Sequence, residues 1–269
     1  MKHVIDGVTY NVEVTGEGFP LVLFHGFTGD STTWKPFYFK WSNDRQLVSI
    51  DIIGHGKSDS PEDVKRYDML SVIGDIKRVL EKLNLTKVDM LGYSMGGRLA
   101  LSFAVQYPDF IRKLILESSS PGLETEEERW DRRKGDEKLC HYIEENGIAQ
   151  FVDYWENIPL FATQKNLSEE KQEEIKQQRL QNNQVGLCNS LKGMGTGSQA
   201  SWWEHLQTFL IETLLLTGTL DEKFCSIAQQ MEKLMPNAKW IQVEGSGHAI
   251  HVEHPEKFGT IVSGFLKNS

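Results

Sequence analysis

One stretch decides the fold: Leu91-Gly92-Tyr93-Ser94-Met95-Gly96-Gly97-Arg98. It contains Gly-x-Ser-x-Gly, a pattern in which a serine lies on a sharp turn between a strand and a helix. Residues 87–91 before it form a short strand-like run, and residues 97–106 after it favour a helix. The three glycines allow the close backbone approach that such a turn requires. The stretch therefore predicts a nucleophile elbow, with Ser94 exposed at the carboxyl end of a strand.

The same pattern also occurs by chance in ordinary glycine-rich turns, so the flanking strand and helix carry the interpretation. In a true elbow the Ser94 hydroxyl lies at a helix N-terminus, where the helix dipole favours negative charge. The backbone N–H of Met95 then points toward a developing oxyanion.

The rest of the chain alternates between apolar strand-like runs and helical patterns. Strands are predicted at 21–24, 47–51, 87–91, 111–116, 213–217 and 238–243, and helices at 67–83, 97–106, 226–235 and 255–267. Residues 2–15 predict a hairpin that turns at Asp6-Gly7 and lies at one edge of the sheet. This order predicts an α/β fold with a mostly parallel twisted sheet, right-handed crossovers and helices on both faces.

Residues 121–201 interrupt this alternation. They contain no long apolar strand, but they carry charged helical stretches at 124–142 and 168–180 and end in a glycine-rich loop at 193–198. Thr125 and Glu128 form the pattern of a capping box. Because the insertion is too long for a loop, we expect a helical cap over the carboxyl ends of the strands, above Ser94. The predicted organisation is a first core part at 1–120, the cap at 121–201 and a second core part at 202–269.

Three residues at predicted strand ends form a candidate catalytic triad. Ser94, Asp221 and His248 occur in the order nucleophile, acid, base. A serine hydroxyl is a poor nucleophile or base until an imidazole accepts its proton, and the imidazole needs a carboxylate to fix its tautomer and stabilise its cation. Alone, Asp221 could cap a turn and His248 could be a core histidine. Together, at these positions, they predict catalysis.

The loop after the first core strand, His25-Gly26-Phe27, predicts the second oxyanion donor. The backbone N–H of Phe27 occupies the matching position, beside that of Met95. His25 is expected to hydrogen-bond the loop and not to act in catalysis.

Composition limits the classes of partner and the compartment. The formal charge of -9 opposes nonspecific binding to nucleic acid or to an anionic membrane surface. The N-terminus has no long apolar run, and no segment approaches 18 uninterrupted apolar residues, so we expect a cytoplasmic protein without membrane insertion. Three widely spaced cysteines agree with a reducing compartment. His248, His251 and His254 share a loop without other ligands, which indicates zinc only weakly, so no metal is expected. Oligomeric state is left open.

With the triad, the His25-Gly-Phe loop and the cap, the chain resembles the α/β-hydrolase superfamily over essentially its whole length. More specifically, it resembles the 2-succinyl-6-hydroxy-2,4-cyclohexadiene-1-carboxylate synthases of menaquinone biosynthesis. The matching motifs are Gly92–Arg98, Ser120–Leu123 with Arg129 and Arg132, Trp155–Phe161, Arg179–Asn183 and Gly193–Gly197.

This resemblance implies a reaction and a set of binding residues. Members of the family eliminate pyruvate from a cyclohexene that carries several carboxylates, without a metal or organic cofactor. The resemblance assigns Arg98, Arg132 and Arg179 to carboxylate binding, and Tyr93, Trp155 and Phe161 to the pocket wall. Around 153–155 the match is compatible with a shift of one residue, so that either Tyr154 or Trp155 would face the ligand.

The distribution of arginine independently indicates an anionic substrate. The chain has 20 lysines and 9 arginines, yet five arginines lie on the elbow helix and the cap: Arg98, Arg129, Arg132, Arg133 and Arg179. The planar guanidinium suits bidentate carboxylate recognition, for which an ordinary lipid esterase has no use. The alternative, pairing with acidic residues on solvated helix faces, applies most to Arg129 and Arg133.

Three functions remain open from the residues. The first is a lyase in which the activated serine removes a proton from the substrate ring and pyruvate is expelled. The second is a serine hydrolase of carboxylic esters or of carbon–carbon bonds in vinylogous diketones. The third, a non-catalytic small-molecule receptor, is disfavoured by the intact triad. The triad alone does not separate lyase from hydrolase, because both reactions begin with the same activated serine.

Overall fold

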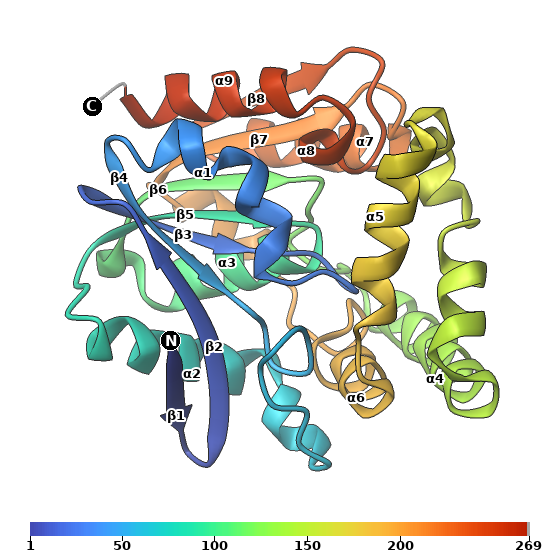
Figure 1. The fold of residues 1–269 in the computed structure, drawn as a ribbon. Helices are drawn as coiled ribbons and strands as arrows, with labels where there is room; N and C mark the ends of the chain where they lie inside the picture. Colours follow the sequence, from blue (N-terminus) through green and yellow to red (C-terminus); the bar gives the residue numbers. More distant parts are fainter. Residues whose placement is uncertain (268–269) are drawn as a thin grey trace.

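The structure, a computed structural model, describes residues 1–267 (Figure 1). Its centre is an eight-stranded sheet in the order β1-β2-β4-β3-β5-β6-β7-β8. The first two strands are antiparallel to their neighbours, and the other six are parallel. The predicted hairpin and its place at one edge are confirmed. The strands are β1 (Lys2–Ile5), β2 (Val8–Thr15), β3 (Phe19–Phe24), β4 (Arg45–Ile50), β5 (Val88–Tyr93), β6 (Ile111–Glu117), β7 (Glu212–Gly218) and β8 (Ala238–Val243).

Alternate side chains of the central strands enter two separate cores, one on each face of the sheet. Val22 of β3 belongs to the core under α2 (Met69–Lys82), α3 (Met95–Gln106) and α7 (Glu222–Leu234). Its neighbours Leu21 and Leu23 belong to the core under α1 (Lys35–Trp41) and α9 (Pro255–Lys267). Each such fully buried aliphatic side chain contributes about 1.5–3 kcal/mol relative to exposure. Burial on both faces explains why these strands are uninterrupted apolar runs.

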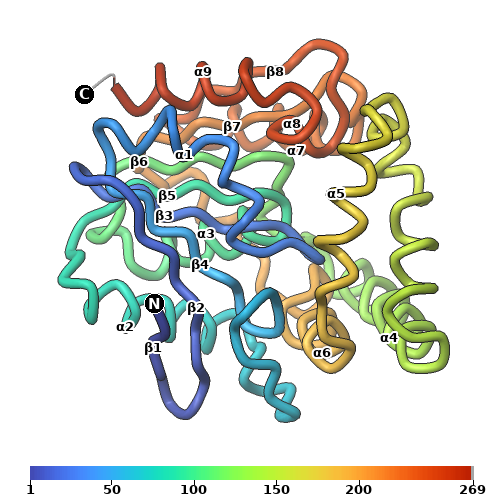
Figure 2. Tube along the Cα trace, viewed as in Figure 1, coloured from blue at the N-terminus to red at the C-terminus, as the bar shows by residue number. Residues whose placement is uncertain are grey.

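Residues 121–201 form helices beyond the ends of the parallel strands. They comprise α4 (Glu126–Trp155), η4 (Pro159–Asn166), α5 (Glu169–Leu180) and α6 (Gln184–Met194). Figure 1 shows α4, α5 and α6 together on the side toward which the arrows of the parallel strands point, and Figure 2 shows the same grouping along the trace. The backbone N–H of Trp202 donates to the Pro121 carbonyl (2.8 Å), so the two ends of this segment meet. The boundaries of the cap, 121 and 201, stay a prediction.

Two helices of this segment differ from the sequence prediction. α4 begins with the predicted capping box of Thr125 and Glu128, but it continues to Trp155 across a break at Gly147 (φ 77°). α6 was not predicted; its N-cap, Asn183, accepts a hydrogen bond from the Gly186 N–H (3.0 Å). The remaining short helices are η1 (Ser31–Trp34), η2 (Val64–Tyr67), η3 (Pro108–Phe110), η5 (Trp203–Thr208) and α8 (Ile250–Glu253).

Among residues 1–267, every helix is too short or too polar to cross a lipid bilayer.

Candidate active site

Ser94 lies on a strained turn between β5 and α3. Its backbone has φ 51° and ψ −109°, a region that costs a non-glycine residue roughly 1–3 kcal/mol. The surrounding glycines permit this turn: a Cβ on Gly92 would lie 2.2 Å from the Gly96 carbonyl oxygen, and one on Gly96 would lie 2.4 Å from that of His25. The Ser94 N–H donates to the Glu117 carbonyl at the end of β6 (2.9 Å). Close packing of backbone on backbone therefore holds Ser94 on this turn, where it is half-buried and not fully exposed as the sequence predicted.

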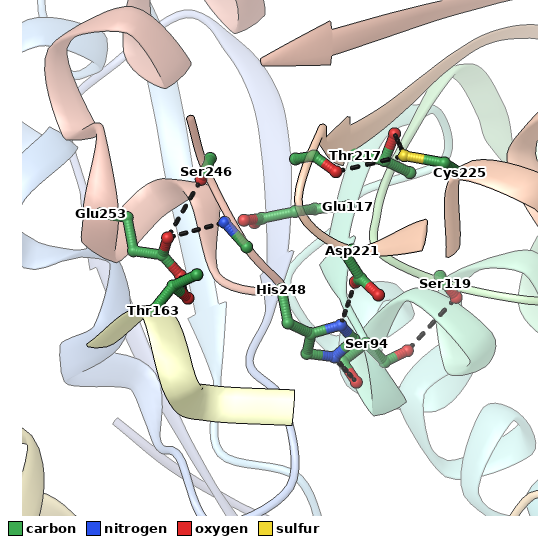
Figure 3. A network of polar contacts seen from close by, with 12 residues as sticks. Ser94, Glu117, Ser119, Thr163, Thr217, Asp221, Cys225, Ser246, His248 and Glu253 are labelled. Atoms are coloured by element: carbon green, nitrogen blue, oxygen red, sulfur yellow. Dashed lines mark hydrogen bonds and ion pairs between the residues drawn. The ribbon is translucent and has the colours of Figure 1, made fainter. Parts of the chain in front are cut away.

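The structure brings the three predicted triad residues together from three strand ends (Figure 3). His248 follows β8, and its Nε2 lies 3.0 Å from Ser94 Oγ. Asp221 follows β7, and its Oδ2 lies 2.7 Å from His248 Nδ1. Because a carboxylate only accepts, Nδ1 carries the proton and Nε2 is free to accept the proton of the serine. This arrangement can activate the hydroxyl either as a nucleophile or as a base.

A clasp formed by Glu253 fixes the loop that carries His248. Its Oε2 accepts hydrogen bonds from the Gly247 N–H (2.7 Å) and from Ser246 Oγ (3.5 Å). Its Oε1 accepts from Thr163 Oγ1 of η4 (3.0 Å), as Figure 3 shows. A Cβ on Gly247 would lie 2.2 Å from Thr163 Oγ1. The clasp, which was not predicted, thus joins the histidine loop to the inserted helices.

The two predicted oxyanion donors are free to bind an anion. In the part of the chain that the structure describes, neither the Phe27 N–H nor the Met95 N–H donates a hydrogen bond. His25 holds the Phe27 loop: its Nδ1 donates to the Gly26 carbonyl (2.8 Å), and its Nε2 accepts from the Ile52 N–H (3.0 Å). His25 therefore has the loop-bonding position expected from the sequence.

The triad opens into a cavity of about 590 Å³, which is in the size range of small-molecule sites. A second cavity of about 430 Å³ lies beside it, and Phe27, Tyr93 and Phe161 line both. The lining of the triad cavity includes Ser94, Met95, Arg98, Ser119, Arg132, Trp155, Leu160, Leu191, Lys223, Phe224 and His248. The cavity also has Glu128 and Asp131 in its lining. Apolar walls with Arg98, Arg132 and Lys223 suit a ligand that has a hydrocarbon body and anionic groups.

Comparison with known proteins gives the family of this chain. The family described as alpha/beta hydrolase fold matches residues 20–255. The chain belongs to the α/β-hydrolase family. This α/β-hydrolase is 45% identical, over 98% of its length and 96% of the relative, to a putative 2-succinyl-6-hydroxy-2,4-cyclohexadiene-1-carboxylate synthase of Bacillus subtilis (strain 168). It is 30% identical to the synthase of that name from Klebsiella pneumoniae, over 88% of its length and 90% of the relative.

A solved structure agrees with these relatives. MenH from S. aureus superposes on the α/β-hydrolase with a TM-score of 0.91 and 36% identity, covering 96% of this chain and 97% of that one. The fold and the resemblance to the synthases, both predicted from sequence motifs, are confirmed.

Two of the three arginines assigned to carboxylates line the triad cavity of this α/β-hydrolase. Arg98, on α3, donates from Nη1 to the Met194 carbonyl (2.8 Å) and to Gln199 Oε1. Burial, followed by the positive charge of Arg132, lowers the pKa of Arg98 to about 10, so the group stays charged near neutrality. Arg132, on α4, donates from Nε to Asp136 Oδ1 (2.9 Å).

Arg179, the third, is placed elsewhere. It lines the second cavity and not the triad cavity, and its guanidinium lies 4.7 Å from the centre of the Phe161 ring, which separates the two. Burial lowers its pKa. Arg129 and Arg133 instead pair with Glu126 and line a groove away from the triad.

The structure places the three aromatic residues of the predicted pocket wall at the triad cavity. Tyr93, Trp155 and Phe161 line the triad cavity. Tyr154 is 50% exposed and packs against Tyr142, so Trp155 is the residue that faces the cavity.

Sequence reasoning missed Lys223 and Phe224, which also line the cavity. The Phe224 ring lies 4.7 Å from that of His248. Both residues lie in the first turn of α7, two and three positions after Asp221, and this closeness in sequence could have indicated them.

The other histidines near His248 do not form a metal site with it. His251 is buried, and both its backbone N–H and its Nδ1 bond the Glu117 carboxylate (2.9–3.0 Å). Within residues 1–267, no group of three or more His, Cys, Asp or Glu side chains is arranged to hold a metal ion.

His55 predicts a pH dependence of stability. It is buried against Phe27 and His25, and burial, followed by the charge of His25, lowers its pKa to about 3. Below about pH 6.5 His55 becomes protonated in the unfolded chain but stays neutral in the folded chain. The free energy of unfolding should therefore fall as pH decreases. We expect His55 alone to account for a loss of about 2 kcal/mol between pH 7.5 and 5, measured by urea unfolding.

The His55→Gln variant should show a correspondingly smaller difference between the two pH values. His141→Gln is the matched control, because the His141 side chain is 73% exposed. Equal pH dependence in wild type and His55→Gln would contradict this explanation.

Proposed function

We propose that this α/β-hydrolase is a lyase that forms 2-succinyl-6-hydroxy-2,4-cyclohexadiene-1-carboxylate by eliminating pyruvate from a succinylated enolpyruvyl-cyclohexene carboxylate, in menaquinone biosynthesis. The observation that carries the proposal is the combination of a hydrogen-bonded Ser94–His248–Asp221 triad with Arg98 and Arg132 in one cavity. A triad alone is equally suited to ester hydrolysis. Two arginines beside the nucleophile suit a polycarboxylate.

In the proposed reaction the serine acts as a base. His248 Nε2 accepts the hydroxyl proton of Ser94 as Ser94 Oγ takes a proton from a ring carbon. The electrons of that carbon–hydrogen bond form a new ring double bond, and the carbon–oxygen bond to the enolpyruvyl group breaks. The leaving enolate takes up the proton that His248 accepted and is released as pyruvate. Asp221 stabilises the imidazolium, as in other triads. The N–H groups of Phe27 and Met95 stabilise negative charge that develops on the substrate.

The arginines select the substrate in this proposal. Arg98 and Arg132 bind carboxylates inside the triad cavity, while Trp155 and Phe161 contact the hydrocarbon body. Arg179 lies behind Phe161, in a position to bind a carboxylate that reaches the second cavity. Every step uses side chains or backbone of this chain, and the proposal includes no cofactor.

We also propose a cytoplasmic location, without a nucleic-acid or membrane partner. The three cysteines, Cys140, Cys188 and Cys225, are unpaired, which suits a reducing compartment.

The decisive experiment is an assay of pyruvate release. The purified protein is incubated with the succinylated enolpyruvyl-cyclohexene carboxylate, and pyruvate is measured with lactate dehydrogenase. We expect catalytic release that depends on enzyme concentration. The serine-hydrolase alternative predicts instead no pyruvate together with rapid hydrolysis of simple esters or of vinylogous diketones, and that result would reject the lyase.

A further inference from the structure

The nine arginines of the chain differ in what holds their guanidinium groups. Within residues 1–267, only Arg98 and Arg179 form no ion pair with an aspartate or glutamate. The other seven each form one: Arg45, Arg66, Arg78, Arg112, Arg129, Arg132 and Arg133. The two exceptions also line the cavities at the active site.

Neutral oxygens hold Arg98 in place of a carboxylate. Its Nη1 donates to the Met194 carbonyl and to the side-chain oxygen of Gln199. Gln199 is 1% exposed, and its amide packs on Gly122, where an added Cβ would lie 2.9 Å from Nε2. Because arginine has only donors, the oxygen of the amide has to face it. Gln199 therefore fixes the guanidinium without neutralising its charge.

Arg179 has the same arrangement in the second cavity. Its Nη2 donates to Gln164 Oε1 (3.1 Å), and both side chains are buried, with 6% and 8% exposure. A buried cation whose partner is uncharged is costly unless an anion joins it. The same pairing, arginine with glutamine, thus occurs at two separate places beside the active site.

We propose that Gln199 and Gln164 are positioning residues that set the charge selectivity of the site: each fixes an arginine through an uncharged amide oxygen and leaves its charge for a substrate carboxylate. The proposal rests on the proposed function, in which the substrate is a polycarboxylate. A glutamate of nearly the same shape would form a charge-assisted pair with the arginine. The substrate would then meet an ion pair at Arg98, as it already does at Arg132 with Asp136, and its attraction to Arg98 would weaken.

The test is Gln199→Glu, compared with Gln199→Met and with Gln207→Glu. Gln207 is exposed on η5, so Gln207→Glu makes the same change in net charge away from the site. For Gln199→Glu we expect KM for the polycarboxylate substrate to rise at least tenfold, kcat to change less, and the thermal midpoint to stay at or above that of the wild type, because an ion pair is gained. Gln199→Met, which loses the acceptor but keeps the charge of Arg98 free, should raise KM less. Gln207→Glu should match the wild type.

Two results would overturn the proposal. One is a wild-type KM in Gln199→Glu. The other is an equal rise in KM in Gln199→Glu and Gln199→Met, which would mean that Gln199 acts through packing alone. Gln164→Glu tests the same idea at Arg179 should Gln199→Glu fail to fold, with the same rise in KM expected and a wild-type KM counting against it.

Binding of propane-1,2,3-tricarboxylate, followed by calorimetry, separates this proposal from the proposed function. Absence of pyruvate release by the wild type would reject the function alone. Tricarboxylate binding that is weakened at least tenfold in Gln199→Glu would still support the role of Gln199. Equal binding by both proteins, or none by the wild type, would reject that role.

Discussion

Ser94→Ala is expected to lower kcat by about 10⁴-fold or more, with little change in stability. The substitution removes the oxygen that is hydrogen-bonded to His248 Nε2, and in the proposed reaction this oxygen takes the substrate proton. Ser94 lies on a turn held by backbone packing of glycines, so the missing oxygen leaves the fold intact. Pyruvate release under saturating substrate measures the loss, and the thermal midpoint serves as the control for folding.

Substitutions of His248 and Asp221 are to be compared with Ser94→Ala. His248→Ala should lose as much activity as Ser94→Ala, because the serine hydroxyl then has no proton acceptor. Asp221→Asn should be comparable or less damaging, since it disturbs the tautomer and charge of His248 but leaves the pair with Ser94. Near-wild-type turnover in Ser94→Ala or His248→Ala would rule out the triad.

Arg98→Ala is expected to lower kcat/KM for the polycarboxylate by roughly ten- to a hundredfold or more. The variant loses a charge-assisted hydrogen bond worth roughly 1.5–3 kcal/mol and leaves a substrate anion unpaired in an enclosed cavity. At about 1.4 kcal/mol per tenfold, this loss corresponds to the stated range. Arg98→Lys restores the charge but not the planar fork, so it should recover only part of the loss.

The comparison with a small neutral ester that the wild type hydrolyses decides what the loss means. Hydrolysis of such an ester should hardly change in Arg98→Ala, because no carboxylate is bound. Arg98 also donates to Met194 and Gln199, which gives it a structural role. An equal decrease in kcat/KM for the anionic and the neutral substrate would mean that this structural role dominates. Arg98 would then no longer support a polycarboxylate substrate.

The parts of the fold that were predictable are those in which local pattern and tertiary environment agree. The central strands are uninterrupted apolar runs because both faces are covered, and their ends could be located within a few residues. The triad was predictable from chain order, since Ser94, Asp221 and His248 each lie in the turn or loop that follows a strand. Parallel strands bring their carboxyl ends to one edge of the sheet, so sequence order alone brought these residues together.

The inserted segment was less predictable because its contacts are made over long distances in sequence. α6 was missed because it contains Gly186 and Gly193, which disfavour a helix locally, while its apolar residues pack against α4. The place of Arg179 behind Phe161 depends on how α5 and η4 lie together, which no local pattern records. Trp155 could have been chosen over Tyr154, because it lies one helical turn from the buried Phe151 on the same face of α4.

The hydrogen bond between Trp202 and Pro121 has a consequence for how such proteins diversify. β6 and β7 are neighbours in the sheet, and the excursion between them leaves and returns at a single closed point. The ends of β6 and β7 are therefore joined independently of the helices between them. Substitutions in that excursion can therefore change the surroundings of Arg132 and Arg179, while Ser94, Arg98 and Asp221 keep the positions that the sheet and α3 give them. The His248 loop depends on both parts, because Glu253 bonds Gly247 and also Thr163 of the excursion.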